Sequence, residues 1–310
     1  MNSRYYPPIV YQISEQEEGW SVKAILHHKM NLSRKLVSRL KYTEQGITLN
    51  GRRVWTNTKV TAGDTVEIRM VKEQSDDILP QPIPLDILYE DDSLLMVNKQ
   101  AGIIVHPTLG HYKDTLANGV VHYWQQKGES YRFRPVHRLD QDTSGVICIA
   151  KNPYVQQAIQ EQMHAFTVHK QYLAVVRGRL PRPHGTIDAP IERDPENPHY
   201  RMVIAEGARA VTRYKVHQAS EEASLVQLQL ETGRTHQIRV HMAHLGHPLI
   251  GDPLYGDPDL NLRYEIDRQA LHAAELGFEH PVTKEPLLFQ APLPADMREL
   301  LDRLSFTISD

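Results

Sequence analysis

Residues 135–150, PVHRLDQDTSGVICIA, place a dense polar cluster directly before an uninterrupted apolar run. The run VICIA, residues 146–150, has the length and composition of a buried strand. A carboxylate such as Asp140 at the entrance of a buried strand is costly unless a cation or several hydrogen bonds compensate its charge. The sequence therefore predicts that Asp140 has a partner elsewhere in the chain.

A second polar cluster, ETGRTHQIRVHMAHLGHP at residues 231–248, contains candidates for that partner. It follows an alternating apolar pattern at residues 226–230 that is typical of a half-buried strand, and it turns through Gly233 into an expected helix. The cluster offers Arg234 and Arg239. An arginine held against an aspartate keeps the carboxylate ionised, which is the state that a nucleophile needs.

Three other chemistries fit these clusters less well. The histidines of residues 241–247 lack the paired acidic ligands of a hydrolytic zinc site, so we expect capping and hydrogen-bonding roles for them. Ser144 in DTSGV does not match the G-x-S-x-G elbow of serine hydrolases. Asp140 and Asp142 belong to one local turn, whereas a glycosidase needs two carboxylates about 5 to 9 Å apart. A single carboxylate with an arginine partner fits best.

The pattern of strands and helices favours an α+β fold for the larger part of the chain. Apolar runs on either side of NKQAG, residues 98–102, predict strand, loop, strand, and a helix is expected around residues 115–126. Further strands are expected at residues 146–150 and 172–177. Because strands outnumber long helices, we expect a mixed, largely antiparallel sheet with helices packed against it. No glycine-rich phosphate loop follows a strand, which argues against a nucleotide cofactor.

Positive charge is concentrated near the N-terminus, although the whole chain has a net charge of −3. Between Trp20 and Lys72, eleven lysines and arginines face three acidic residues, an excess of eight positive charges. Such an excess in a short segment is an electrostatic footprint for phosphate. The candidate residues for contact with phosphate are Arg34, Lys35, Arg39, Lys41, Arg52 and Arg53.

The basic segment also has the pattern of a small α/β domain. Apolar residues at helical spacing predict a helix within residues 31–46, with Asn31 or Ser33 as N-cap. Asn50-Gly51 predicts a hairpin, and residues 65–70 a further strand. The acidic, proline-rich stretch that follows predicts a stiff linker. We therefore expect a small basic domain at residues 1–72, a linker at 73–85 and a larger domain at 86–310.

The composition is that of an ordinary globular protein. Of the 310 residues, 40% are hydrophobic and 24% charged, and no window approaches the ~20 apolar residues of a membrane span. The single cysteine, Cys148, lies in the apolar run, so it has no disulfide partner in the chain, and a small buried hydrophobe is the expected role. We expect a cytoplasmic protein without membrane contact, and a monomer.

The motifs taken together resemble those of the RluA-type pseudouridine synthases, which isomerise uridine within ribosomal or transfer RNA. HRLDQDTSG at residues 137–145 is similar to the family signature that contains the catalytic aspartate, here Asp140. ETGRTHQIRVH, KQYLAVVRG and GDPLYG match further family motifs, and the N-terminal segment is similar to a small S4-like RNA-binding domain. One departure is Gln100, which stands where the family usually has proline and affects loop stiffness more than chemistry.

The resemblance implies roles for the residues of these motifs. Asp140 would act at the ribose, as a nucleophile or by taking a ribose proton. Tyr172 would pack on the uracil, and Arg234 would form the salt bridge to Asp140. Beyond the resemblance, we assign substrate binding to Arg138, which would fill the space of the flipped base or grip its phosphate, and to His137, Thr143 and Arg239. The alternatives are a salt bridge from Arg138 to Asp142, a structural role for His137 in positioning the loop, and hydrogen bonds from Thr143 and Ser144 to the backbone at the strand entrance.

The reaction implied by the resemblance gains and loses no atoms, so no cofactor and no metal is expected. The expected partner is structured RNA, with large-subunit (23S) ribosomal RNA favoured and transfer RNA as the alternative. Two other classes stay open on the residues alone. One is a non-catalytic RNA-binding assembly factor, which need not keep Asp140, Tyr172 and Arg234 together. The other is a nucleoside or sugar hydrolase, which would need a second carboxylate to activate water.

Overall fold

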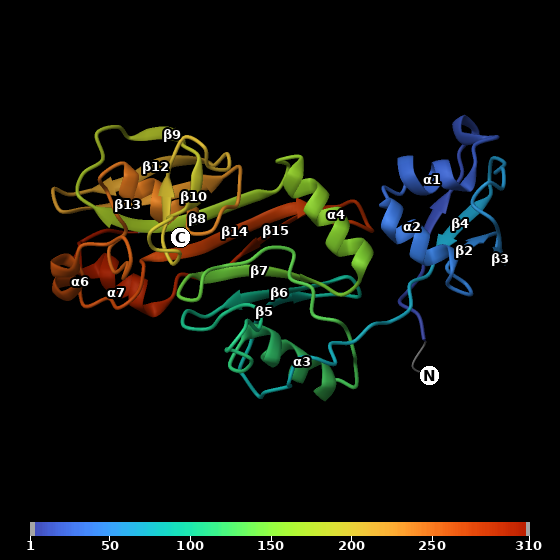
Figure 1. Ribbon diagram of the computed structural model, residues 1–310, viewed down its shortest axis with the longest axis horizontal. Coiled ribbons are helices and arrows are strands. Elements are labelled where there is room, and N and C mark those ends of the chain that lie inside the picture. Colours follow the sequence, from blue (N-terminus) through green and yellow to red (C-terminus); the bar gives the residue numbers. More distant parts are fainter. Residues whose placement is uncertain (1–3, 308–310) are drawn as a thin grey trace.

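The computed structural model describes residues 4–307, apart from the side chain of Leu260. The N-terminal module lies at one end of an elongated molecule, and a large twisted sheet fills the rest (Figure 1). The elements of the module are β1 (Ile9–Gln12), the 3-10 turn η1 (Glu15–Glu17), α1 (Val22–His28), α2 (Arg34–Lys41), β2 (Ile47–Leu49), β3 (Arg52–Arg53) and β4 (Thr65–Ile68). Its strands form an antiparallel sheet in the order β1-β4-β2-β3.

Local sequence signals explain the two basic elements of the module. Ser33 is the N-cap of α2, and its hydroxyl accepts a hydrogen bond of 3.2 Å from the backbone N–H of Leu36. Leu36, Val37 and Leu40 form the buried face of α2, so its basic side chains point outward. Asn50 and Gly51 both have positive φ, 50° and 76°, which is the geometry of the tight turn between β2 and β3. The predicted helix, cap and hairpin are confirmed.

The larger domain is built on a nine-stranded sheet. Its strands follow the order β5-β6-β7-β14-β8-β13-β12-β9, and β15 pairs with β14. The strands are β5 (Asp86–Glu90), β6 (Leu94–Lys99), β7 (Ser144–Ala150), β8 (His169–Arg177), β9 (His184–Asp188), β12 (Val211–Ala219), β13 (Ala223–Leu230), β14 (Leu271–Glu279) and β15 (Pro286–Gln290). All neighbours are antiparallel except β7 and β14. The mixed, largely antiparallel sheet predicted from the sequence is confirmed.

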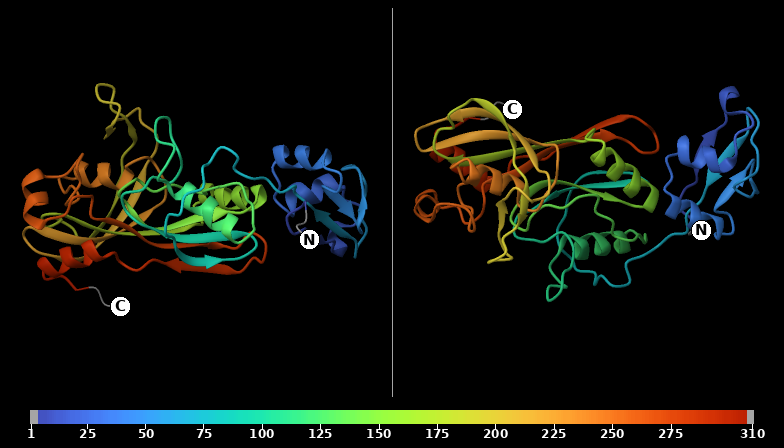
Figure 2. Two further views of the ribbon diagram at one scale, coloured as in Figure 1. Left: turned by 90° about the horizontal axis from the view of Figure 1, so that it is seen from below. Right: turned by 45° about the horizontal axis from the view of Figure 1, so that its top comes forward.

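Helices cover the sheet, and a short ribbon projects from it (Figures 1 and 2). The helices are α3 (Leu116–Gln126), α4 (Pro153–His164), α5 (Gln237–His244), α6 (Pro258–Tyr264) and α7 (Ala295–Arg303), and the ribbon pairs β10 (Ile191–Arg193) with β11 (Arg201–Val203). The apolar sides of β6 and β7 are buried on both faces of the sheet: Leu95, Val97, Ile147 and Ile149 pack with α3, and Met96 and Cys148 pack with α4. Within residues 4–307, no helix is long and apolar enough to cross a membrane.

The register of three central strands determines where the site forms. Gly145 in β7 lies opposite Ala273 in β14, and Ala273 lies opposite Tyr172 in β8. A Cβ at Gly145 would stand 2.2 Å from the carbonyl oxygen of Ala273, and Gly145 has φ of 115°, so only glycine fits. The loop that carries Asp140 therefore enters the sheet two strands from Tyr172.

One predicted strand is wrong. The apolar run Ile103–Val105, after NKQAG, forms no strand beyond an isolated bridge between Ile104 and Thr115. The carbonyl oxygens of Ile104 and Val105 instead accept hydrogen bonds from the N–H groups of Leu116 and Ala117, in the first turn of α3. Because the helix start uses these carbonyls, they are not available to a sheet.

The proline-rich stretch of residues 73–85 forms no helix or strand and lies against α3. The side chain of Asn118 donates a 2.7 Å hydrogen bond to the carbonyl of Leu79, and the N–H of Gln81 donates to the carbonyl of Asn118 at 3.1 Å. Glu73, at the start of the stretch, pairs with Arg39 of α2 and with the buried Arg134 of the larger domain. Contacts of this stretch therefore connect the two parts of the chain.

Candidate active site

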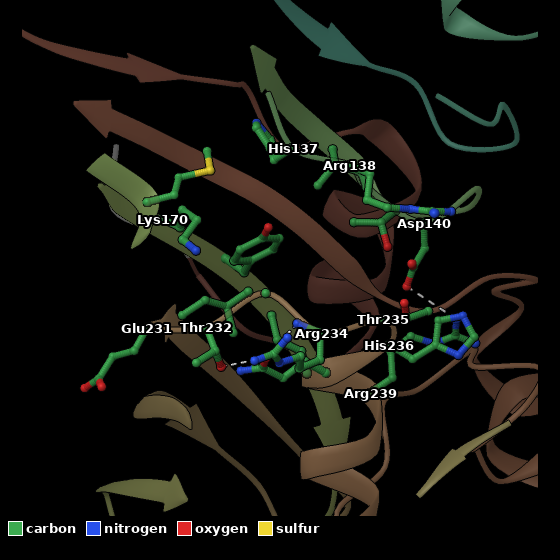
Figure 3. A pocket seen from close by; sticks show the side chains of 18 of the residues that line it. His137, Arg138, Asp140, Lys170, Glu231, Thr232, Arg234, Thr235, His236 and Arg239 are labelled. Carbon is green, nitrogen blue, oxygen red and sulfur yellow. Dashed lines mark hydrogen bonds and ion pairs between the residues drawn. The ribbon is translucent and has the colours of Figure 1, made fainter. Parts of the chain in front are cut away.

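A cavity of about 540 Å³ opens between the loop before β7, the end of α4, β8 and the start of α5. The structure brings all seven predicted catalytic and substrate-binding residues to its wall: Asp140, Tyr172, Arg234, Arg138, His137, Thr143 and Arg239. These residues come from segments up to 102 positions apart in the sequence. Figure 3 shows Asp140 beside His236 and Arg239, on the opposite side of the cavity from Glu231.

The cation that meets Asp140 is Arg239. Its Nη1 lies 3.6 Å from Oδ2 of Asp140, and the Arg239 side chain is only 5% exposed. The expected salt bridge from Arg234 is wrong: Arg234 is exposed, and its Nε donates to the carbonyl of Arg209 at 3.0 Å. The physical reason is the position of α5, because Arg234 precedes the helix while Arg239 lies on its buried side.

Arg239 is held in place by a second carboxylate. Its Nε and Nη2 donate two hydrogen bonds of 2.7 Å to the fully buried Asp252, and the ring of Tyr255 lies 5.2 Å from the guanidinium. Burial disfavours the charged guanidinium, but the bonds to Asp252 and the charge of Asp140 outweigh it, so the pKa of Arg239 is raised. Arg239 therefore stays charged and fixed in orientation beside Asp140.

Asp252 is a site residue that the sequence reasoning missed. It lies in GDPLYG, and one of its oxygens also accepts hydrogen bonds from the N–H groups of Leu254 and Tyr255, at 2.9 and 3.1 Å. The only sequence signal was the Gly-Asp-Pro turn itself, which gives no hint that a guanidinium lies above it. The bidentate pairing makes Asp252 the anchor of the site.

Tyr172 is a buried residue of β8 that lines the same cavity. Burial, followed by the negative charge of Asp140, raises the pKa of the Tyr172 hydroxyl above its ordinary value. The hydroxyl therefore stays protonated at neutral pH, and the ring offers a flat apolar wall next to the carboxylate.

The polar residues around Asp140 mainly form hydrogen bonds that hold the loop before β7 in place. His137 accepts a hydrogen bond from the N–H of Cys148 at 3.3 Å through Nε2, and burial lowers its pKa to about 4, so it is neutral. The hydroxyls of Thr143 and Ser144 were expected to bind backbone groups, but they bond the side chains of Gln269 and His272, at 3.2 and 2.9 Å. The loop and the start of β7 are thus tied to Gln269, just before β14, and to His272 within β14.

Arg138 is exposed, and it takes no part in the ion pairs found among residues 4–307. A salt bridge from Arg138 to Asp142, the structural alternative, is therefore not formed. The exposed guanidinium lies at the wall of the cavity.

Lys99 is the second residue that the sequence reasoning missed. Its ammonium group is buried and donates hydrogen bonds to the carbonyls of Gln100, Ile103 and Gln141, at 2.9, 2.9 and 2.8 Å. Gln141 directly follows Asp140, so Lys99 joins the NKQAG loop to the loop of the carboxylate. The sequence showed a lysine at the end of a strand, which is usually a solvated position.

Among the described residues, no group of three or more histidine, cysteine, aspartate or glutamate side chains has the arrangement of a metal site. His241, one of the three histidines weighed as zinc ligands, is fully buried, and its ring nitrogens contact the hydroxyl of Thr212 at 2.8 Å and the carbonyl of Ala189 at 2.9 Å. Its role in the structure is hydrogen bonding within the core.

Comparisons with known proteins agree with this geometry. Residues 93–244 match the family model described as RNA pseudouridylate synthase, and residues 9–66 match the RluD ribosomal pseudouridine synthase N-terminal domain. The uncharacterized RNA pseudouridine synthase YhcT of Bacillus subtilis is 41% identical over 290 residues, covering 93% of this chain and 94% of its own. The chain belongs to the RluA-type RNA pseudouridine synthases.

Other members of the family support this assignment. Ribosomal large subunit pseudouridine synthase D of Xanthomonas campestris is 42% identical over 266 residues, covering 83% of this chain and 80% of its own. Among solved structures, Human RNA Pseudouridylate Synthase Domain Containing 4 matches with a TM-score of 0.59 at 25% identity, over 73% of this chain and 95% of that chain. This RluA-type synthase is therefore an isomerase that converts uridine in RNA to pseudouridine.

Proposed function

We propose that this synthase isomerises specific uridines of large-subunit ribosomal RNA, with Asp140 as the catalytic carboxylate. The observation that carries the role of Asp140 is its position in the cavity, where a buried and anchored Arg239 faces it and Tyr172 lies nearby. The choice of RNA rests on relatives named ribosomal large subunit pseudouridine synthase, such as that of Escherichia coli, which is 37% identical over 254 residues.

The reaction breaks the bond between C1′ of the ribose and N1 of uracil, turns the base and joins C5 to C1′. A proton leaves C5 and N1 gains one, so the composition of the RNA does not change. Asp140 acts at the sugar, as a nucleophile on C1′ or as a base toward a ribose proton. Arg239 holds a positive charge beside the carboxylate and orients it, and the Tyr172 ring packs on the uracil.

The uridine must leave its stack before it reaches Asp140. Extruding a base costs a few kcal/mol, and contacts of the protein with the neighbouring nucleotides offset this cost. Arg138 is exposed at the cavity beside the carboxylate, so we assign to it the space of the flipped base or its phosphate.

The N-terminal module, residues 1–72, supplies affinity for the RNA backbone in this proposal. The side chains of Arg34, Lys35, Arg39, Lys41, Arg52 and Arg53 are all exposed. Two exposed aromatic residues, Tyr42 and Trp55, at 88% and 79% exposure, stand close to them in the chain and suit base stacking. Arg39 also pairs with Glu73, and Arg53 donates to the carbonyl of Lys41 at 3.0 Å, so these two offer fewer free donors than the other four.

In this proposal residues 73–85 join the module to a catalytic domain at residues 86–310. In this proposal the enzyme acts in the cytoplasm. It acts as a monomer, because the surface with which it docks on a large RNA has to stay free.

The test of the proposed function is a map of pseudouridine in total RNA from cells with and without the gene. Carbodiimide labelling followed by primer extension locates each site. Stops in large-subunit ribosomal RNA that vanish in the deletion strain, and return with the wild type but not with Asp140→Asn, are expected. If stops vanish only in transfer RNA, the target is transfer RNA and not ribosomal RNA. If every stop persists in the deletion strain, the proposed function is wrong.

A further inference from the structure

Phe166 occupies a left-handed backbone position that glycine or asparagine usually takes. The helix α4 ends at His164, and Phe166 follows with φ of 58°. The N–H of Phe166 donates to the carbonyl of Met163 at 3.2 Å, and the N–H of Thr167 donates to that of Gln162 at 3.0 Å. This is the Schellman end of a helix, in which glycine or asparagine usually takes the left-handed residue. A bulky side chain there is strained.

The ring of Phe166 contributes little to the stability of the fold, although its backbone position is strained. Phe166 is 54% exposed and belongs to none of the clusters of the hydrophobic core in the described part of the chain. The apolar contact that accompanies a Schellman end is made by the following residue and not by the left-handed one. A strained and half-exposed aromatic side chain therefore points to a use at the surface, where strain is tolerated for function.

The ring lies at the wall of the cavity that contains Asp140, and a cation faces it. Phe166 and the neighbouring Met163 and His164 all line this cavity. The guanidinium of Arg209, which comes from the segment before β12, lies 5.9 Å from the centre of the Phe166 ring, and the Arg209 side chain is 57% exposed. The carbonyl of Arg209 accepts the hydrogen bond from Arg234, which links this pair to the polar turn before α5.

We propose that Phe166 and Arg209 form a stacking site for the base of a nucleotide next to the target uridine. This inference rests on the proposed function, because it needs an RNA whose uridine is flipped into the cavity. Flipping leaves a neighbouring base without its stacking partner, and an exposed ring with an adjacent guanidinium replaces that partner for any base. The uridine enters toward Asp140, and the neighbouring base stays at the rim with Phe166.

Substitution of Phe166 tests the site, because the RNA affinity is expected to fall while the thermal stability is expected to stay or to rise. Phe166→Asn removes the ring and suits the left-handed backbone, so the melting temperature is expected to stay or to rise by about 2–4 °C. The affinity for a fluorescein-labelled 12-mer of oligouridylate, measured by anisotropy, is expected to fall roughly 5- to 100-fold. Because stacking is not electrostatic, the loss of affinity in Phe166→Asn should persist at high salt. Arg209→Gln removes a charge, so its loss of affinity should shrink as salt rises.

Two further variants complete the test. Phe166→Tyr keeps an aromatic ring and should bind within about twofold of the wild type. Lys284→Asn is the matched control, because Lys284 is also exposed with a positive φ of 65°, in the turn between β14 and β15. It should leave the affinity for the oligonucleotide unchanged.

Several outcomes overturn the stacking site: no binding of the 12-mer by the wild type, equal binding by Phe166→Asn, or an equal loss in Phe166→Tyr and Phe166→Asn. A fall in melting temperature of Phe166→Asn by more than about 4 °C would make Phe166 a structural residue. If no stop in ribosomal RNA vanishes in the deletion strain, but binding of the 12-mer still depends on Phe166, then ribosomal RNA is not the target and the stacking site stands.

Discussion

The N-terminal module and the cavity both gather cations, but they hold them in opposite ways. In the module, Arg34, Lys35 and Arg52 are exposed on a small domain, without a fixed geometry imposed by buried partners. In the cavity, Arg239 is 5% exposed and bonded through two nitrogens to the buried Asp252. An exposed charge contributes to affinity at long range and is screened by salt, whereas a buried and anchored charge orients one neighbouring group. Removing charges from the two regions should therefore have different consequences.

The largest effect is expected for the carboxylate of the cavity. Asp140→Asn removes the carboxylate that acts at the ribose in the proposed mechanism while keeping its size, so turnover should fall by at least about 10⁴-fold. Release of tritium from C5 of labelled uridine in ribosomal RNA measures turnover, and anisotropy measures RNA affinity, which should stay close to that of the wild type. Substantial activity in this variant would remove Asp140 from its role.

A comparison of two arginines in the same cluster sharpens the contrast between anchored and exposed charges. Arg239→Gln leaves the buried Asp252 without its cation, so a loss of about 3–5 kcal/mol in the free energy of unfolding is expected, together with a loss of turnover. Arg234→Gln changes an exposed residue and should cost less than about 1 kcal/mol. Urea unfolding of both variants measures the free energy of unfolding. Equal losses would contradict the assignment of the Asp140 partner to Arg239.

Stability of the larger domain should depend on pH through a buried histidine. His272 is 1% exposed, with contacts to the Ser144 hydroxyl and the Ala291 carbonyl, and burial lowers its pKa to about 4 from an ordinary value near 6.5. Between these pH values the unfolded chain binds the proton that the folded protein excludes. The free energy of unfolding should therefore fall with decreasing pH, by up to about 3 kcal/mol from pH 6.5 to pH 4.

The control for this pH dependence is His272→Gln, which keeps hydrogen-bonding groups but has no proton to gain. Urea unfolding at several pH values between 6.5 and 4 should give a shallower slope for this variant than for the wild type. Parallel slopes would exclude His272 as the source.

The smallest effect is expected for the exposed charges of the module. Substitution of both Arg52 and Arg53 by glutamine should weaken RNA binding severalfold at low salt and reduce the slope of log affinity against log salt by up to about 2. Arg298→Gln, an exposed arginine in α7 at the other end of the molecule, serves as the control. A loss that does not depend on salt would contradict an electrostatic role for the module.

Much of the fold and part of the site followed from the sequence by itself. Ser33, the Asn50-Gly51 turn and the apolar periodicities act over a few residues, so they specify caps, hairpins and strands without knowledge of the rest of the chain. The polar cluster before VICIA was enough to select Asp140 and to require a cation. The run Ile103–Val105 shows the limit, because its carbonyls cap α3, and no local pattern records that use.

The tertiary structure alone decided how the groups of the site meet. Arg234 and Arg239 stand five residues apart in one cluster, and only the packing of α5 turns Arg239 toward Asp140 and Asp252. Lys99 joins two loops that are about 40 residues apart, through carbonyl groups that every sequence has. Contacts between distant segments depend on the register of β7, β14 and β8, which is set by the pairing of the whole sheet. The sequence supplies the chemical groups, and the sheet decides which of them become partners.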